Sequence, residues 1–123
     1  MGPIIVKEKI APKILQELLD EYFEIMVKIA VDIEKEICAA HGEWHSFGQE
    51  ILADKKNSDG SNVWGANFYP QEKGAKRIEY VSLINIKPAA GNRSIMIEDG
   101  EVRKKVKEIA EKLILGENEE FSS

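Results

Sequence analysis

The sequence contains one cysteine, Cys38, so it can form no internal disulfide. It has no apolar run long enough to span a bilayer and no charged leader of the kind that precedes a signal-peptide core. These absences predict a cytoplasmic protein in a reducing compartment, without a membrane partner. The net charge of −5 at pH 7 argues against a general nucleic-acid binder, because such proteins carry a basic stripe.

Several catalytic signatures are also missing. The chain has no phosphate-binding glycine loop, no nucleophile elbow and no CxxC motif. Cys38 falls in a predicted strand, which makes it a small core residue rather than a nucleophile. The sequence therefore names no reaction, and the cofactor, if there is one, stays unknown.

What is present is typical of one soluble globular domain. The 123 residues are 43% hydrophobic and 32% charged, enough to build a core without covalent links. Residues 1–116 are predicted to form a single α+β domain. Its mainly antiparallel sheet of about five strands is packed by an N-terminal and a C-terminal helix, with one short helix between them. The acidic residues 117–123 are predicted to be a flexible tail.

A hairpin is predicted at the centre of the sheet. The side chains of Arg77–Lys87 would alternate between the two faces of a strand. In the middle of this segment both faces are apolar, as in a strand covered on two sides. Asn62–Tyr69 reads as the preceding strand, which Pro70 ends because proline has no amide donor. The short linker Gln71–Lys76 favours an antiparallel connection. Beyond the hairpin, Ile95–Ile97 is either a small strand or an extended link.

Two helices frame the chain. Pro12 opens the first at its favoured position, after a short edge strand over Pro3–Ile10. Asp99 is the expected N-cap of the last, which ends near Leu115 before Gly116. The residues of both helices expected to be buried are Leu18, Leu19, Phe23, Val106, Ile109 and Leu113.

The segment Ile25–Ala40 has two interpretations. Its apolar residues could continue the first helix, but their alternation and the many β-branched side chains favour strands. We predict two strands, Met26–Ile33 and Glu36–Ala40, although the residues between them are poor turn formers. Ser46, followed by Gln49, has the spacing of a capping box and predicts a short helix with Phe47, Ile51 and Leu52 buried.

Two stretches could carry chemistry. His41, Glu43 and His45 would share one side of an extended segment, and imidazole and carboxylate groups suit a transition metal. The spacing matches no metal signature, so a polar loop with a structural His45 is favoured and no metal site is predicted. Asn92, Arg93 and Ser94 follow the predicted central strand as donors suited to a carboxylate or phosphate.

If these two stretches met, they would form a pocket for a small anionic ligand. His45 would act as acid or base, Glu43 would orient it, and Arg93 would grip the anion beside Asn92 and Ser94. Amides at the helix start around Ser46 would add to the attraction. The alternative, favoured for Arg93 alone, is an ion pair with a nearby carboxylate such as Glu98 or Asp99.

Taken together, four motifs resemble a family of small prokaryotic proteins of unknown function, over about Ile4–Leu115. The motifs are Gly42–His45 (GEWH), Trp64–Pro70 (WGANFYP), Ile84–Ser94 (INIKPAAGNRS) and Glu101–Ile109 (EVRKKVKEI). The resemblance implies strands over Val27–Ala40 and brings no activity, cofactor or substrate. His41 stands where the family pattern has glycine, which weakens the metal interpretation. The side chains on motif positions are Glu43, His45, Trp64, Asn67, Asn85, Asn92, Arg93 and Ser94.

Two functions from different classes remain open. The first is a small binding or interaction domain, which would self-associate as a homo-oligomer through a sheet edge or an apolar patch. The second is a hydrolase-like enzyme on an anionic substrate, with His45 as acid or base and Arg93 as anion clamp. The first is favoured, because the sequence displays no complete catalytic set.

Overall fold

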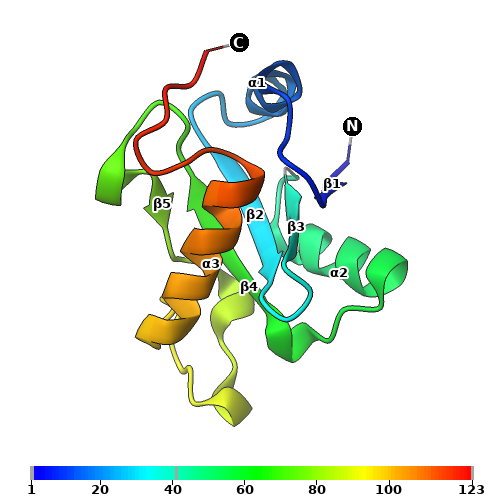
Figure 1. Ribbon diagram of the computed structural model, residues 1–123. Coiled ribbons are helices and arrows are strands. Elements are labelled where there is room, and N and C mark those ends of the chain that lie inside the picture. Colours follow the sequence, from blue (N-terminus) through cyan, green and yellow to red (C-terminus); the bar gives the residue numbers. More distant parts are fainter. Residues whose placement is uncertain (1, 41, 123) are drawn as a thin grey trace.

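The computed structural model describes residues 2–40 and 42–122, which form one five-stranded sheet and three α-helices (Figure 1). The strand order is β1-β3-β2-β4-β5, and every neighbouring pair is antiparallel. This confirms the predicted α+β class. The short strands β1 and β5 are the two edges, and self-association through either edge stays a prediction. The strands are β1 (Ile4–Val6), β2 (Val27–Asp32), β3 (Ile37–Ala40), β4 (Val63–Phe68) and β5 (Ile78–Glu79).

The helices lie on both faces of the sheet and are α1 (Pro12–Glu21), α2 (His45–Lys56) and α3 (Gly100–Leu113). Figure 1 shows α3 in front of the sheet and α2 on its other side. Helices α1 and α3 share the larger apolar cluster with one face, and α2 covers a smaller cluster on the opposite face. The prediction of buried helix residues is confirmed for all but Phe23, which is partly exposed.

The two strands predicted after the first helix are confirmed as β2 and β3. Their turn is built by a side chain rather than by glycine. The carboxylate Oδ1 of Asp32 accepts the amide N–H groups of Glu34 and Lys35, both at 2.9 Å. Glu36 then adopts a left-handed backbone with φ 57°. An aspartate that bonds its own following backbone is a recognised turn former, so the turn chemistry was present but overlooked.

The predicted central strand Arg77–Lys87 is wrong. The hairpin itself is confirmed, but β5 is only Ile78–Glu79 and lies at the sheet edge. The hydroxyl of Ser82 accepts the Ile84 amide at 3.2 Å and starts a 3₁₀ turn over Leu83–Asn85. This local bond takes the backbone out of the ladder, because a serine side chain competes with strand pairing.

The short helix is confirmed as α2, but its predicted start is wrong. It begins at His45 and is preceded by Trp44, so Ser46 lies inside the first turn and forms no capping box with Gln49. Phe47 is 44% exposed rather than buried. Gly48 allows the helix to approach the sheet, because a Cβ there would stand 3.0 Å from the Cβ of Ala30.

The last helix starts as predicted, with Asp99 Oδ1 accepting the Glu101 amide at 2.8 Å. Its other end is tied to distant parts of the chain. The buried guanidinium of Arg77 donates to the carbonyl oxygens of Glu72, at 2.7 Å, of Pro70, at 2.8 Å, and of Gly116. The Ile10 amide donates to the Leu113 carbonyl at 2.9 Å, so the region before α1 is held to the end of α3.

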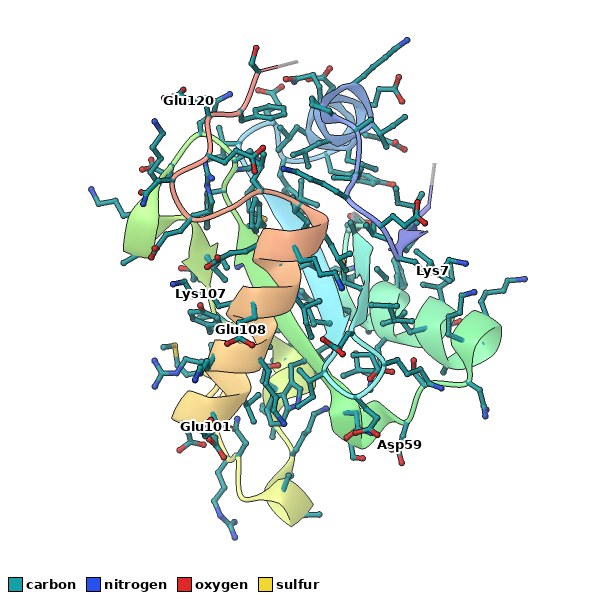
Figure 2. All side chains as sticks on the ribbon, in the orientation of Figure 1. Lys7, Asp59, Glu101, Lys107, Glu108 and Glu120 are labelled. Carbon is teal, nitrogen blue, oxygen red and sulfur yellow. The ribbon has the colours of Figure 1, made fainter. Side chains whose placement is uncertain are left out.

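The acidic tail follows these anchors. Phe121 is buried within the larger apolar cluster, and Glu119 pairs with Lys9 at 2.6 Å. Glu120, labelled in Figure 2 at the upper end of the molecule, pairs with Lys73. The flexibility expected of residues 117–123 stays a prediction, which these contacts make testable.

Candidate functional site

A cavity of about 280 Å³ opens on the α2 side of the sheet, and we refer to it as the His45 cavity. It lies between the start of α2, the paired strands β2 and β4, and the loop that follows β5. Ten residues line it, namely Lys28, Trp44, His45, Ser46, Asn67, Val81, Ser82, Leu83, Ile84 and Ile95. Ligand sites have this character, a mostly apolar concavity with a few polar groups.

His45 enters this cavity as a neutral imidazole. Its Nε2 lies 2.9 Å from the carbonyl oxygen of Ala66, and since a carbonyl only accepts, Nε2 carries the proton. Nδ1 is therefore left as an acceptor. The pKa of His45 is lowered from 6.5 to about 4, mainly by burial. The charge of Lys28 contributes to this lowering, and the interactions with the Ala66 carbonyl and with Asn67 oppose it.

Lys28 and Asn67 stand directly opposite each other on β2 and β4. Lys28 has no carboxylate within salt-bridge distance among the residues described, and its ammonium lies 5.3 Å from the centre of the Phe23 ring. The Asn67 amide donates to Glu79 Oε1 at 2.8 Å, which fixes its orientation. Its Oδ1 is buried and finds no partner in the described part of the chain. Among the described residues, the polar wall thus holds a cation without a carboxylate partner and an acceptor without a donor.

The remaining walls are mostly apolar and partly open to solvent. Three rim residues are well exposed for their type, Trp44 at 56%, Leu83 at 71% and Ile95 at 41%. Leu83 takes this place because of the 3₁₀ turn that replaces the expected strand. Exposed apolar side chains around a concavity are typical of ligand grooves and interaction sites.

Asn92 serves the structure of its own loop. Its Nδ2 donates to the carbonyl oxygens of Asn85 at 2.8 Å, Ser94 at 3.0 Å and Met96 at 2.9 Å, and its Oδ1 accepts the Glu98 amide at 2.8 Å. A side chain with every hydrogen-bonding group in use has little left for a ligand.

The other predicted anion-binding residues do not reach the His45 cavity. Arg93 is exposed, and its backbone amide donates to Glu98 Oε2 at 2.7 Å. The Ser94 hydroxyl lies 3.2 Å from the Met96 carbonyl within the same loop. Asn92 borders a separate cavity of about 480 Å³ with Trp64. The structure thus brings together His45 and Ser46 but not the Arg93 loop, whose ligand-binding role stays a prediction.

The first predicted set is only partly described. Glu43 is exposed and does not line the His45 cavity, and His41 lies outside the described residues. Among residues 2–40 and 42–122, no group of three histidine, cysteine, aspartate or glutamate side chains could hold a metal ion.

Sequence reasoning missed Lys28 and gave Asn67 no role beyond its motif position. One signal was available for Lys28, which is the only charged residue in the otherwise apolar run Val27–Val31. A cation inside such a strand needs a partner or a solvent path. The pairing of Lys28 with Asn67 depends on strand register, which no local pattern reveals.

Comparison with known proteins identifies the family but no function. No helix in the described part of the chain is long and apolar enough to cross a membrane. Neither the curated proteins nor the solved structures contain a significant match to the chain. One family model, described as a protein of unknown function (DUF5674), matches residues 4–113. Since this match covers nearly the whole sequence, the chain belongs to the DUF5674 family.

Proposed function

We propose that this protein is a binding domain that takes a small, mostly apolar molecule into the His45 cavity. The observation that carries the proposal is a single concavity in which a buried acceptor, Asn67 Oδ1, and a cation, Lys28, lack a polar partner among the described residues and lie beside exposed apolar side chains. A buried polar atom without a partner costs free energy, and native proteins keep few of them without a reason. A ligand that donated a hydrogen bond to the unpartnered acceptor would remove this cost. By covering the rim, it would also remove exposed apolar surface from water.

The same geometry supports binding over hydrolysis. With a pKa of about 4, His45 is a weak base at neutral pH, below the range in which general bases work efficiently. The anion clamp that the hydrolase-like alternative requires is Arg93, which does not line this cavity. The only hydroxyl groups at the cavity are those of Ser46 and Ser82 among the described lining residues, and Ser82 already accepts the Ile84 amide.

Trp44 provides a direct test because it lies on the rim. In a Trp64→Phe background it is the only tryptophan, since the chain has two. We expect leucine, isocaproate or isoamylamine, small probes that share a branched apolar tail and differ in their charged groups, to change its emission in a saturable way. Absence of a saturable change with all three probes would rule out the proposal.

A pair of variants on α2 ties the signal to the cavity. Ser46→Phe places a ring on an exposed lining residue and should abolish the response. Ala53→Phe adds the same ring to an exposed position of α2 outside the cavity and should leave the response intact. An unchanged response in Ser46→Phe would place the binding elsewhere.

A further inference from the structure

We infer that the ligand of the His45 cavity is a free α-amino acid with an apolar side chain. This inference rests on the proposed function and narrows it to one chemical class. An α-amino acid carries an ammonium, a carboxylate and a side chain on one carbon. The cavity offers a complementary group for each of the three.

The ammonium would meet two acceptors. His45 Nδ1 presents a lone pair because Nε2 donates to Ala66, and Asn67 Oδ1 is buried without a partner in the described part of the chain. Asn67 lies close enough to His45 to stabilise a charged imidazolium, which raises the pKa of His45, but burial outweighs this effect and keeps the ring neutral. Nδ1 and Asn67 Oδ1 are therefore two acceptors close to each other. An ammonium has three N–H donors and can serve both acceptors at once.

The carboxylate would meet Lys28. This residue faces Asn67 across β2 and β4, and directly opposed side chains have Cβ atoms about 5 Å apart. The two side chains therefore leave the sheet next to each other, and both line the cavity, so that one small zwitterion could contact both. The first amides of α2 add to the attraction, because no side chain among the described residues caps them.

The side chain would lie against the apolar wall formed by Leu83, Ile84 and Ile95. The cavity, at about 280 Å³, lies just below the usual range for ligand sites, roughly 300–1,000 Å³. A single amino acid suits this space better than a peptide segment. A simple carboxylate would leave the two acceptors unpaired, and a simple amine would leave Lys28 unpaired, so the zwitterion is selected over both.

Calorimetric titration of the intact chain with three matched ligands tests this selection. Isocaproate is leucine without its amino group, and isoamylamine is leucine without its carboxylate. We expect leucine to bind about tenfold or more tightly than either analogue, since each lacks one charge-assisted contact. If an analogue binds as tightly as leucine, the inference is wrong while the proposed function stands. If none of the three binds, the proposed function itself fails.

Two lysine variants locate the carboxylate contact. Lys28→Met keeps the apolar stem beside Phe23 and should weaken leucine binding about tenfold, with isoamylamine binding unchanged. Lys104→Met removes an exposed lysine of α3, outside the cavity, and should change neither. Full leucine affinity in Lys28→Met would overturn the assignment. The three-ligand series uses the unaltered protein, so it decides the question even if a variant folds poorly.

Discussion

The side chain of Asn85 hydrogen-bonds both backbone groups of Gly65, with Oδ1 accepting the Gly65 amide at 2.8 Å and Nδ2 donating to its carbonyl at 3.0 Å. This pair of bonds is the one that a neighbouring strand residue would normally make. Asn85 therefore substitutes for an edge strand, and β4 keeps a satisfied backbone although the following segment has left the ladder.

Replacing Asn85 should be costly for this reason. Asn85→Ala leaves two buried backbone groups of Gly65 without partners, and we expect a loss of roughly 2–5 kcal/mol in the free energy of unfolding. Urea denaturation measures the change. Asn118→Ala, at an exposed tail position, is the matched control. A loss below half a kcal/mol would mean that water replaces the Asn85 amide.

Gly65 should tolerate no side chain. A Cβ at this position would stand 2.5 Å from the Cβ of Ser82, and we expect Gly65→Ala to lower the free energy of unfolding by about 1–3 kcal/mol through overpacking. Adding Ser82→Gly should recover part of the loss by removing the clashing atoms. Gly100→Ala, where the new methyl group meets open space, is the control. Equal losses in the single and double variants would contradict the close approach.

Stability should fall as the pH drops through the range set by His45. Its pKa is about 6.5 when unfolded and about 4 when folded, mainly because of burial. Between these values the unfolded chain binds more protons, so the free energy of unfolding rises with pH and is lost as pH falls. We expect His45 to account for roughly 1–3 kcal/mol of this loss. Urea midpoints measured between pH 4 and pH 6.5 should fall less with pH in His45→Gln than in the unaltered protein. An equal pH dependence in the two proteins would refute the assignment of this effect to His45.

Cys38 should be inert in the native protein. It is fully buried in β3, and burial raises the pKa of its thiol to about 12. Reaction with a thiol reagent should be slower in the native than in the unfolded chain by roughly a thousandfold or more, because exposure of a strand paired on both sides requires an opening close to global unfolding. Rapid native labelling would place Cys38 at an accessible position.

Phe121 provides a test of whether the C-terminal tail is ordered or flexible. It is 9% exposed and packs with the larger apolar cluster, so Phe121→Ala should cost about 2–4 kcal/mol of unfolding free energy. Ser122→Ala serves as the exposed neighbour control. A change below half a kcal/mol, with unprotected amides in residues 117–122, would instead favour the flexible tail that composition predicts.

The success of strand prediction differed between two similar patterns. Val27–Ala40 alternates and is rich in β-branched residues, and both strands formed where expected. Arg77–Lys87 alternates equally well but contains Ser82 and Asn85, whose side chains bond backbone groups and replace the ladder. Serine and asparagine inside an apolar alternating pattern were the sequence signal that this segment would leave the strand ladder.

The site was predictable only in part. His45 was identified because an imidazole before a short helix is chemically conspicuous. Its partners are set by long-range geometry, since the contribution of Lys28 depends on its register with Asn67 and that of Leu83 on a 3₁₀ turn. Arg93 looked equally suitable in sequence, but its side chain is exposed and does not line the His45 cavity, although Ile95 of the same loop does.

The bonds from Ile10 to Leu113 and from Arg77 to Gly116 have a consequence for synthesis on the ribosome. A nascent chain emerges from its N-terminus, and strands β1–β5 are all translated before α3. Until α3 leaves the exit tunnel, the apolar face that it covers has nothing to shield it from chaperones and proteases. A transcript truncated ahead of Gly100 would therefore yield an aggregation-prone product rather than a smaller working domain.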